Sequence, residues 1–210
     1  MFTGIVTAIG TIESVERRGD LHVRIACPFD AHGIAIGASI ACSGICLTVV
    51  ERGEQPGGAW FAVDVSDETV SRTASDMWSQ GQRINLEPSL KLGDEMGGHI
   101  VSGHVDAVGR VVDWRPEGGS MRITIEAPSE LAPFIAAKGS ITVDGVSLTV
   151  NEVRDAEDGT YFAVNVIPHT QAMTTLGDFA EGQTVNVEID VLARYLQRME
   201  HYRARPIPQP

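Results

Sequence analysis

Residues 39–49 read Ser39-Ile40-Ala41-Cys42-Ser43-Gly44-Ile45-Cys46-Leu47-Thr48-Val49. A similar segment follows 101 residues later, Ser140-Ile141-Thr142-Val143-Asp144-Gly145-Val146-Ser147-Leu148-Thr149-Val150. The match extends downstream, where Gly81-Gln82-Arg83-Ile84-Asn85-Leu86-Glu87 aligns with Gly182-Gln183-Thr184-Val185-Asn186-Val187-Glu188. About 16 of 30 compared positions are identical, whereas ordinary residue usage gives about two by chance. The chain therefore contains an internal repeat.

A period near 100 residues is too long for one unit of a solenoid, so each copy is expected to be a whole domain. Domains of this size can bury their own core. We place the boundary near Met96-Gly97-Gly98. The predicted division is residues 1–97, residues 98–190, and a C-terminal segment of residues 191–210.

Each copy consists of short segments rich in Val, Ile, Thr and aromatic residues, separated by glycines. Examples are Leu21 to Ala26, Leu47 to Glu51, Phe61 to Val65 and Met121 to Glu126. Short, partly alternating segments at this spacing are typical of an all-β barrel or sandwich.

The pattern changes after the second copy. Apolar residues recur there at helical spacing, and Arg205-Pro206-Ile207-Pro208 is expected to end the helix. A lone helix of this length is marginal in water, so its apolar stripe should pack on something. Two interpretations remain open, packing on its own barrel and self-association. The stripe comprises Val191, Leu192, Tyr195, Leu196, Met199 and Tyr202.

The formal net charge of −12, with few and scattered basic residues, argues against binding to nucleic acid or to an anionic membrane surface. No apolar run approaches the length of a membrane-spanning helix, and Met1-Phe2-Thr3-Gly4-Ile5-Val6 lacks the basic region of a signal peptide. Three cysteines without a C-x-x-C pair suit reduced thiols. We therefore expect a cytoplasmic protein.

The informative residues are those that differ between the copies. Cys46 aligns with Ser147, and Ile5 aligns with His104. If each copy built its own ligand pocket, one pocket would hold a thiol, and the other a hydroxyl and an imidazole. The competing interpretations are a buried structural thiol for Cys46 and a hydroxyl bonded to nearby backbone for Ser147.

His104 is a candidate general acid or base, although a purely structural histidine is an equal alternative. His99 lies five residues earlier, but a strand would send the two imidazoles to opposite faces, so we expect no metal site. Asp190 comes just before the predicted helix and could act in the chemistry or simply cap that helix.

With these residues in view, the chain resembles the riboflavin synthase family. The resemblance rests on the Met1-Phe2-Thr3-Gly4-Ile5-Val6 start, the paired Gly44-x-Cys46-Leu47-Thr48-Val49 and Asp144-Gly145-x-Ser147-Leu148-Thr149-Val150 motifs, and Gly97-Gly98-His99-x-x-Ser102-Gly103-His104. It implies an all-β fold of two similar six-stranded antiparallel Greek-key barrels. It also implies a C-terminal trimerisation helix, and active sites between the first barrel of one subunit and the second barrel of a neighbour.

The reaction implied by the resemblance is a transferase-type dismutation of two molecules of 6,7-dimethyl-8-ribityllumazine. A four-carbon unit moves between them, giving riboflavin and 5-amino-6-(ribitylamino)uracil without metal or redox cofactor. The implied partners are that substrate, two further copies of the chain, and lumazine synthase as a candidate. One alternative is a non-catalytic lumazine or flavin antenna. Another is a β-barrel flavin reductase domain, which would require a nicotinamide-binding partner domain, and the repeat leaves no room for that domain.

The asymmetry that the reaction needs is expected where the repeat is broken. Cys46, His104 and Ser147 are therefore candidate catalytic residues, and Asp190 is a further candidate as an orienting or nucleophile-activating acid. The resemblance assigns substrate contacts to both copies: Phe2, Thr3, Gly4, Ile5, Val6, Ser39, Cys46, Leu47, Thr48, Asp64, Val65, Ser66, Asp67, Glu68 and Thr69 in the first, and Gly103, His104, Val105, Lys138, Ser147, Leu148, Thr149, Val166, Ile167, Pro168, His169, Thr170 and Gln171 in the second.

Overall fold

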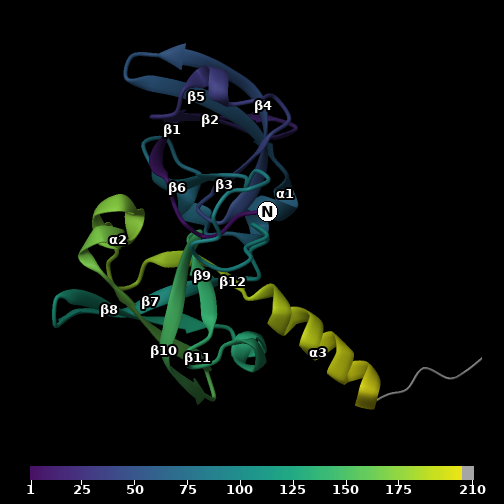
Figure 1. Ribbon diagram of the computed structural model, residues 1–210, viewed down its shortest axis with the longest axis vertical. Coiled ribbons are helices and arrows are strands. Elements are labelled where there is room, and N and C mark those ends of the chain that lie inside the picture. The colour runs from purple at the N-terminus through teal and green to yellow at the C-terminus, as the bar shows by residue number, and fades with distance from the viewer. Residues whose placement is uncertain (205–210) are drawn as a thin grey trace, which may run out of the picture.

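A computed structural model describes residues 1–204, which form two closed antiparallel barrels followed by one long helix (Figure 1). The first barrel contains β1 Ala8–Arg18, β2 Asp20–Cys27, η1 Ala31–Gly33, β3 Ser39–Cys42, β4 Ile45–Gln55, β5 Gly58–Val65, α1 Asp67–Arg72, η2 Ser75–Met77 and β6 Arg83–Pro88. The second contains β7 Ala107–Glu117, β8 Ser120–Ala127, η3 Ser129–Phe134, β9 Ser140–Val143, β10 Val146–Ala156, β11 Gly159–Val166, α2 Pro168–Met173, η4 Thr175–Asp178 and β12 Thr184–Ile189, and α3 Val191–Ala204 follows.

The two barrels have the same strand order. The first closes as β1-β2-β5-β4-β3-β6, and the second as β7-β8-β11-β10-β9-β12. Even the register shifts repeat, with one in β4 between Val49 and Glu51 and its counterpart in β10 between Val150 and Glu152. Bulges of this kind bend a strand and help a sheet to close. The prediction of two six-stranded barrels is confirmed.

Each barrel has its own hydrophobic core. Phe61 and Phe162, which align in the repeat, are fully buried in the first and second core respectively. In β4, residues up to Val49 alternate between buried and more exposed side chains, so Leu47 and Val49 point inward and Thr48 points outward. The period-2 pattern of the sequence thus places every second residue of this strand within reach of solvent or ligand.

The barrels meet where the β3–β4 and β9–β10 hairpin turns face each other. The Asn85 side chain donates to the Asp144 carbonyl at 2.9 Å, and the Asn186 side chain donates to the Ser43 carbonyl at 3.0 Å. Asn85 and Asn186 align in the repeat, so these bonds form a crossed pair. The pair is not fully symmetric, because a hydroxyl at Ser43 stands opposite a carboxyl at Asp144.

Asp144, at this contact between the barrels, has a raised pKa. Burial raises its pKa from the ordinary value of 3.8 to about 7, the Asn186 N–H lowers it, and the nearby Asp76 raises it further. The protonated carboxyl therefore stabilises the fold; this contribution is fully present below pH 3.8 and is lost as pH rises through about 7. Asp144→Asn keeps an acceptor for the Asn186 N–H at 2.7 Å without the charge.

We expect Asp144→Asn to raise stability at pH 8 by about 2 to 4 kcal/mol and to change it little at pH 4. Thermal unfolding at pH 4, 6 and 8 and at one protein concentration measures this difference. Asp20→Asn, at an exposed position, is the control. Parallel stability curves for Asp144→Asn and the unmodified chain between pH 5 and 8 would contradict the prediction.

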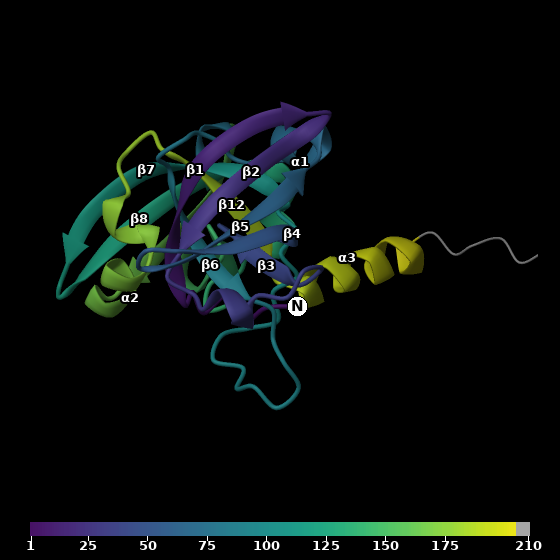
Figure 2. The same cartoon turned by 90° about the horizontal axis from the view of Figure 1, so that it is seen from above.

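Helix α3 leaves the second barrel and projects away from both barrels (Figures 1 and 2). An ion pair of 2.9 Å between Arg194 and Asp106 fastens its first turns. The residues of its apolar stripe beyond the half-buried Val191 lie in solvent, with Leu196 62% exposed and Tyr195 65% exposed. Packing of this stripe on its own barrel is therefore the wrong interpretation. The predicted stop at 205–208 lies outside the described residues.

Within residues 1–204, no helix is both long enough and apolar enough to cross a membrane.

Candidate functional site

The two copies exchange their starting segments. Residues 2–6, the first start segment, lie beside residues 101–105, the second start segment, through an antiparallel bridge between Phe2 and Val101. Past the bridge each segment reaches the other copy's barrel. Val6 packs against the second core, and Val105 packs against the first core. Each barrel is thus completed by the start of the other copy.

The first site lies around Cys46 at the start of β4. The Cys46 N–H donates to the Gly103 carbonyl at 2.8 Å, which brings the second start segment onto the first barrel. A cavity of about 230 Å³ opens there between β4, α1 and that segment. The residues that line it are Ile45, Cys46, Glu68, Thr69, Arg72, Thr73, Gly103, His104 and Val105. A thiol and an imidazole therefore share this cavity.

Helix α1 presents polar groups to the first site because its first turn is firmly capped. Ser66 is the N-cap, and its Oγ accepts from the Thr69 N–H at 3.2 Å. Asp67 and Glu68 in the first turn also stabilise this end of the helix, because negative charges interact favourably with the positive end of the helix dipole. The cap holds the Thr69 hydroxyl 3.0 Å from Ser66 Oγ, so the cavity has a fixed hydroxyl group on its helical side.

The second site lies around Ser147 at the start of β10. The Ser147 N–H donates to the Gly4 carbonyl at 2.8 Å, so the first start segment covers the second barrel. The Ser147 hydroxyl lies 2.7 Å from Nδ1 of His99, and Nε2 of His99 lies 3.2 Å from the Thr142 hydroxyl. These side chains form a chain of hydrogen bonds in which His99 is central.

The surroundings of His99 favour its neutral form, chiefly because the ring is buried. Burial lowers its pKa below the ordinary value of 6.5, although the charges of Asp190 and Glu188 partly oppose this effect. A neutral imidazole can accept the Ser147 hydroxyl proton at Nδ1 while its Nε2–H donates to Thr142. The second site therefore has the arrangement of a hydroxyl beside a general base.

The side chains are not grouped copy by copy, as they would be if each copy built its own ligand pocket. Cys46 shares the first site with His104, whereas Ser147 lies with Gly4 and His99 in the second. The two histidines do separate, as expected, but not across a strand. Val101, which lies between the two histidines in the chain, pairs with Phe2 in the bridge. On either side of this bridge, His99 lies at the second barrel and His104 lies at the first.

Four residues that contribute to the sites were absent from the sequence-based candidates. His99 was considered only for a metal, and Thr142 aligns with Ala41, so no repeated pattern marked either residue. Glu87 and Glu188 carried a usable signal, because both are identical in the two copies, and both prove to be buried.

Of the other candidates, Asp190 acts as the helix cap that the alternative interpretation describes, and the remaining ones have separate partners. The Asp190 carboxylate caps α3, accepting from the Leu192 N–H at 2.9 Å. Asp64 is bonded to His22 at 2.7 Å. Ser39 lines a separate groove beside η1. In the second barrel, Val166 is buried and its carbonyl accepts from the Gln171 side chain at 2.7 Å.

Lys138 stands out by its backbone. Its φ is +69°, a left-handed conformation that is unfavourable for lysine, whereas the aligned Gly37 adopts +83° without strain. The Lys138 N–H donates to the Val150 carbonyl at 2.7 Å, which holds this conformation. Strained residues of this kind occur often at functional positions.

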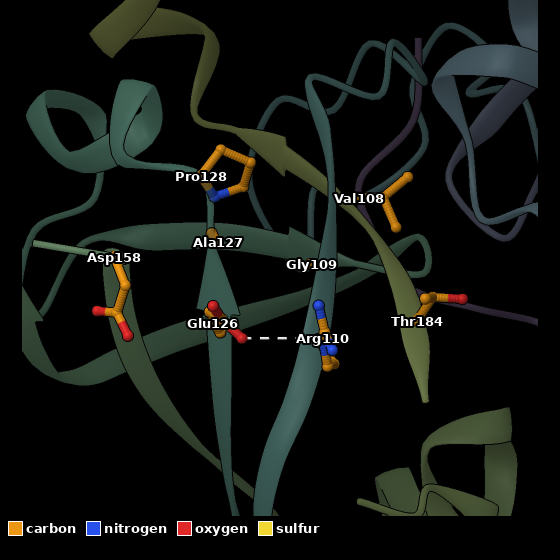
Figure 3. Close-up of a pocket in the computed structure, with 8 residues that line it drawn as sticks. All are labelled: Val108, Gly109, Arg110, Glu126, Ala127, Pro128, Asp158 and Thr184. Carbon is orange, nitrogen blue, oxygen red and sulfur yellow. Dashed lines mark ion pairs between the residues drawn. The ribbon is translucent and has the colours of Figure 1, made fainter. Parts of the chain in front are cut away.

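A third cavity, of about 260 Å³, lies on the outer surface of the second barrel (Figure 3). Arg110 and Glu126 face each other across it at 3.8 Å, and Asp158 lies at its rim. None of the candidate site residues lines this cavity.

The chain is similar to known proteins over nearly its whole length. The family model of the lumazine binding domain matches twice, at residues 3–89 and at residues 102–190. A riboflavin synthase of Brucella abortus (strain 2308) is 49% identical over 97% of this chain and 100% of its own length. A riboflavin synthase of Mycobacterium tuberculosis (strain ATCC 25618 / H37Rv) is 43% identical over 95% of this chain and 98% of its own length.

Solved structures of LumP show the same fold. The complex with riboflavin has a TM-score of 0.74, and the complex with 6,7-dimethyl-8-(1'-D-ribityl) lumazine has a TM-score of 0.71. Both are 24% identical and cover 90% of this chain and 99% of LumP.

Proposed function

Since this chain belongs to the riboflavin synthase family, we propose that it converts two molecules of 6,7-dimethyl-8-ribityllumazine into riboflavin and 5-amino-6-(ribitylamino)uracil. The observation that carries this proposal is similarity to riboflavin synthases over nearly the whole chain, including both repeats. Two barrels of one fold suit a reaction that uses one compound twice. Each barrel can hold one lumazine, and holding both lowers the entropic barrier to their reaction.

The crossed start segments support different chemical roles for the two lumazines. The first site combines Cys46 with His104, whereas the second combines Ser147 with His99. The proton to be moved is on the C7 methyl group of a lumazine, and the resulting negative charge is delocalised into the ring. The protein therefore needs to orient the ring and to accept or relay that proton.

In this proposal His104 relays protons at the first site, and Cys46 contacts the ring near C7. At the second site the Ser147 hydroxyl, with His99 as its base, contacts or adds to C7. Asp190 acts through His99, since its charge favours the protonated imidazole. Threonine hydroxyls and backbone groups along the start segments suit the dione edge and the ribityl hydroxyls.

We further propose a homotrimer built on α3, with each complete active site shared between neighbouring subunits. The exposed stripe of α3 supports self-association, because an isolated helix of this length is marginal in water and exposed apolar residues favour burial. The division into residues 1–97, 98–190 and 191–210 stays our working definition of the domains. Three free cysteines fit a reducing compartment, which supports the prediction of a cytoplasmic location. Contact with lumazine synthase is a separate prediction.

Incubation of the purified protein with the lumazine under inert gas tests the activity. We expect riboflavin to appear at half the molar amount of lumazine consumed, together with equal 5-amino-6-(ribitylamino)uracil, as measured by chromatography. Bound lumazine that fluoresces but stays unchanged would instead favour the antenna function and would refute the synthase proposal.

A further inference from the structure

Two glutamates occupy the same place in the two barrels. Glu87 lies near the end of β6, and Glu188 lies near the end of β12. The side chains are buried, with 6% and 2% of each residue exposed. A buried carboxylate is costly unless hydrogen-bond donors surround it, and in each case the donors belong to the start segment of the same copy.

Glu87 holds the first start segment by three bonds. Its Oε1 accepts from the Thr3 N–H at 2.7 Å and from the Thr3 hydroxyl at 2.8 Å, and its Oε2 accepts from the Gly4 N–H at 2.9 Å. Burial raises the pKa of Glu87, and these bonds oppose that rise. The Ile5 N–H is not bonded to Glu87; it donates to the Thr3 hydroxyl at 3.2 Å instead.

Glu188 holds the second start segment by four bonds. Its Oε1 accepts from the Ser102 N–H at 2.7 Å and from the Ser102 hydroxyl at 2.6 Å. Its Oε2 accepts from the Gly103 N–H at 2.9 Å and from the His104 N–H at 3.0 Å. Glu188 therefore fixes the backbone of His104 itself, a contact without a counterpart at Glu87.

Immediately beyond these bonds the segments cross to the other barrel. Gly4 is so close to Ser147 that an added Cβ would lie 2.6 Å from the Ser147 Cβ, and Gly103 is equally close to Cys46, at 2.7 Å. Both glycines have φ near +80°, which favours glycine. A displacement of either segment is thus transmitted directly to the thiol or hydroxyl of the opposite barrel.

We propose that Glu87 and Glu188 are positioning residues that act crosswise: Glu87, in the first barrel, sets the geometry around Ser147 in the second site, and Glu188, in the second barrel, sets the geometry around Cys46 and His104 in the first site. This proposal deepens the proposed function and rests on it for any effect on turnover. The crossed contacts themselves can be tested without catalysis.

A carboxylate is required because every partner of these oxygens is a donor. Glutamine would turn an NH₂ group toward at least one backbone N–H, which loses a hydrogen bond and opposes two donors. Glu87→Gln and Glu188→Gln have nearly the same shape as the native residues, so each variant serves as the matched control for the other.

The rate at which iodoacetamide alkylates a thiol measures how accessible that thiol is, and thus how well the start segment covers the site. Cys46 is the natural probe of the first site, because Cys27 and Cys42 are buried and burial raises the pKa of both thiols. We expect Glu188→Gln to raise the alkylation rate of Cys46 at least fivefold, and Glu87→Gln to change it less than twofold.

A chain carrying Cys46→Ser and Ser147→Cys moves the probe to the second site. There the order should reverse, with Glu87→Gln raising the alkylation rate at least fivefold and Glu188→Gln changing it less than twofold. Equal acceleration by both variants at either probe, or none, would overturn the proposal. Where Glu188→Gln fails to fold, Ser102→Ala removes one bond to Glu188 and should raise Cys46 alkylation at least twofold.

In the synthase assay both glutamine variants should lower kcat at least tenfold, with KM changed less. A crosswise alkylation pattern in a chain that makes no riboflavin would leave the positioning role standing and refute only the proposed function. Normal turnover and parallel alkylation in both variants would refute the positioning role and leave the synthase standing.

Discussion

Replacing Ser147 with alanine is expected to lower kcat by about 10²-fold or more, within the range for loss of a positioned acid–base pair. The reason is the hydrogen bond of 2.7 Å between the Ser147 hydroxyl and Nδ1 of His99, which disappears together with the hydroxyl that is proposed to contact C7. His99→Ala should have a loss of similar size. Because the two residues act as one unit, the double variant should be little worse than either single variant.

Steady-state assays with the lumazine measure these changes, and Ser129→Ala, at an exposed position, is the matched control. Since burial lowers the pKa of His99, activity should persist below pH 6.5, where an unperturbed imidazole would already be protonated. Near-normal turnover by both Ser147→Ala and His104→Ala, with unchanged trimer content, would show that the catalytic assignment is wrong.

Replacing Leu196 with glutamate is expected to dissociate the proposed trimer into monomers and to lower activity at least tenfold. Leu196 lies at the middle of the exposed stripe of α3, and a trimer would bury it against the same stripe of two other copies. A carboxylate buried there without a partner costs several kcal/mol, on the order of the stability of such a contact. Activity falls because the proposed active site needs residues from two subunits.

Sedimentation at several protein concentrations measures the change in mass. Gln197→Glu adds the same charge at the next position, away from the stripe, and should leave the trimer intact. Removal of residues 191–210 provides an independent check. If that truncated chain still sediments as a trimer, α3 does not hold the subunits together.

Much of the architecture could be predicted because local residue patterns, such as strand alternation and helical spacing, indicate it. The alternation in residues 45–49 marks a strand with one buried face. The repeat predicts that the second half of the chain has the same fold as the first half. The helical spacing of Leu192, Leu196 and Met199 marked the position of α3. These patterns depend on neighbours in the chain, so a single sequence is sufficient to find them.

The composition of the sites could be predicted only in part. Cys46, His104 and Ser147 were found because the repeat is broken at these positions. The pairing of His99 with Ser147 was missed, because the proposed base role depends on a hydroxyl 48 residues away and on burial that lowers the pKa of His99. Glu87 and Glu188 are identical in the two copies, but identity alone does not separate a residue that the fold requires from one that the site requires.

Residue patterns alone were sufficient to predict two like all-β domains, a C-terminal amphipathic helix, and two unlike residues, Cys46 and Ser147, at matching places. The folded structure was needed to show that His104 lies with Cys46 and His99 lies with Ser147. The physical reason is that residues 2–6 and 101–105 carry no local signal for their destination. Their path is set by the bridge between Phe2 and Val101 and by the buried carboxylates of Glu87 and Glu188, whose partners lie more than 80 residues away in the chain.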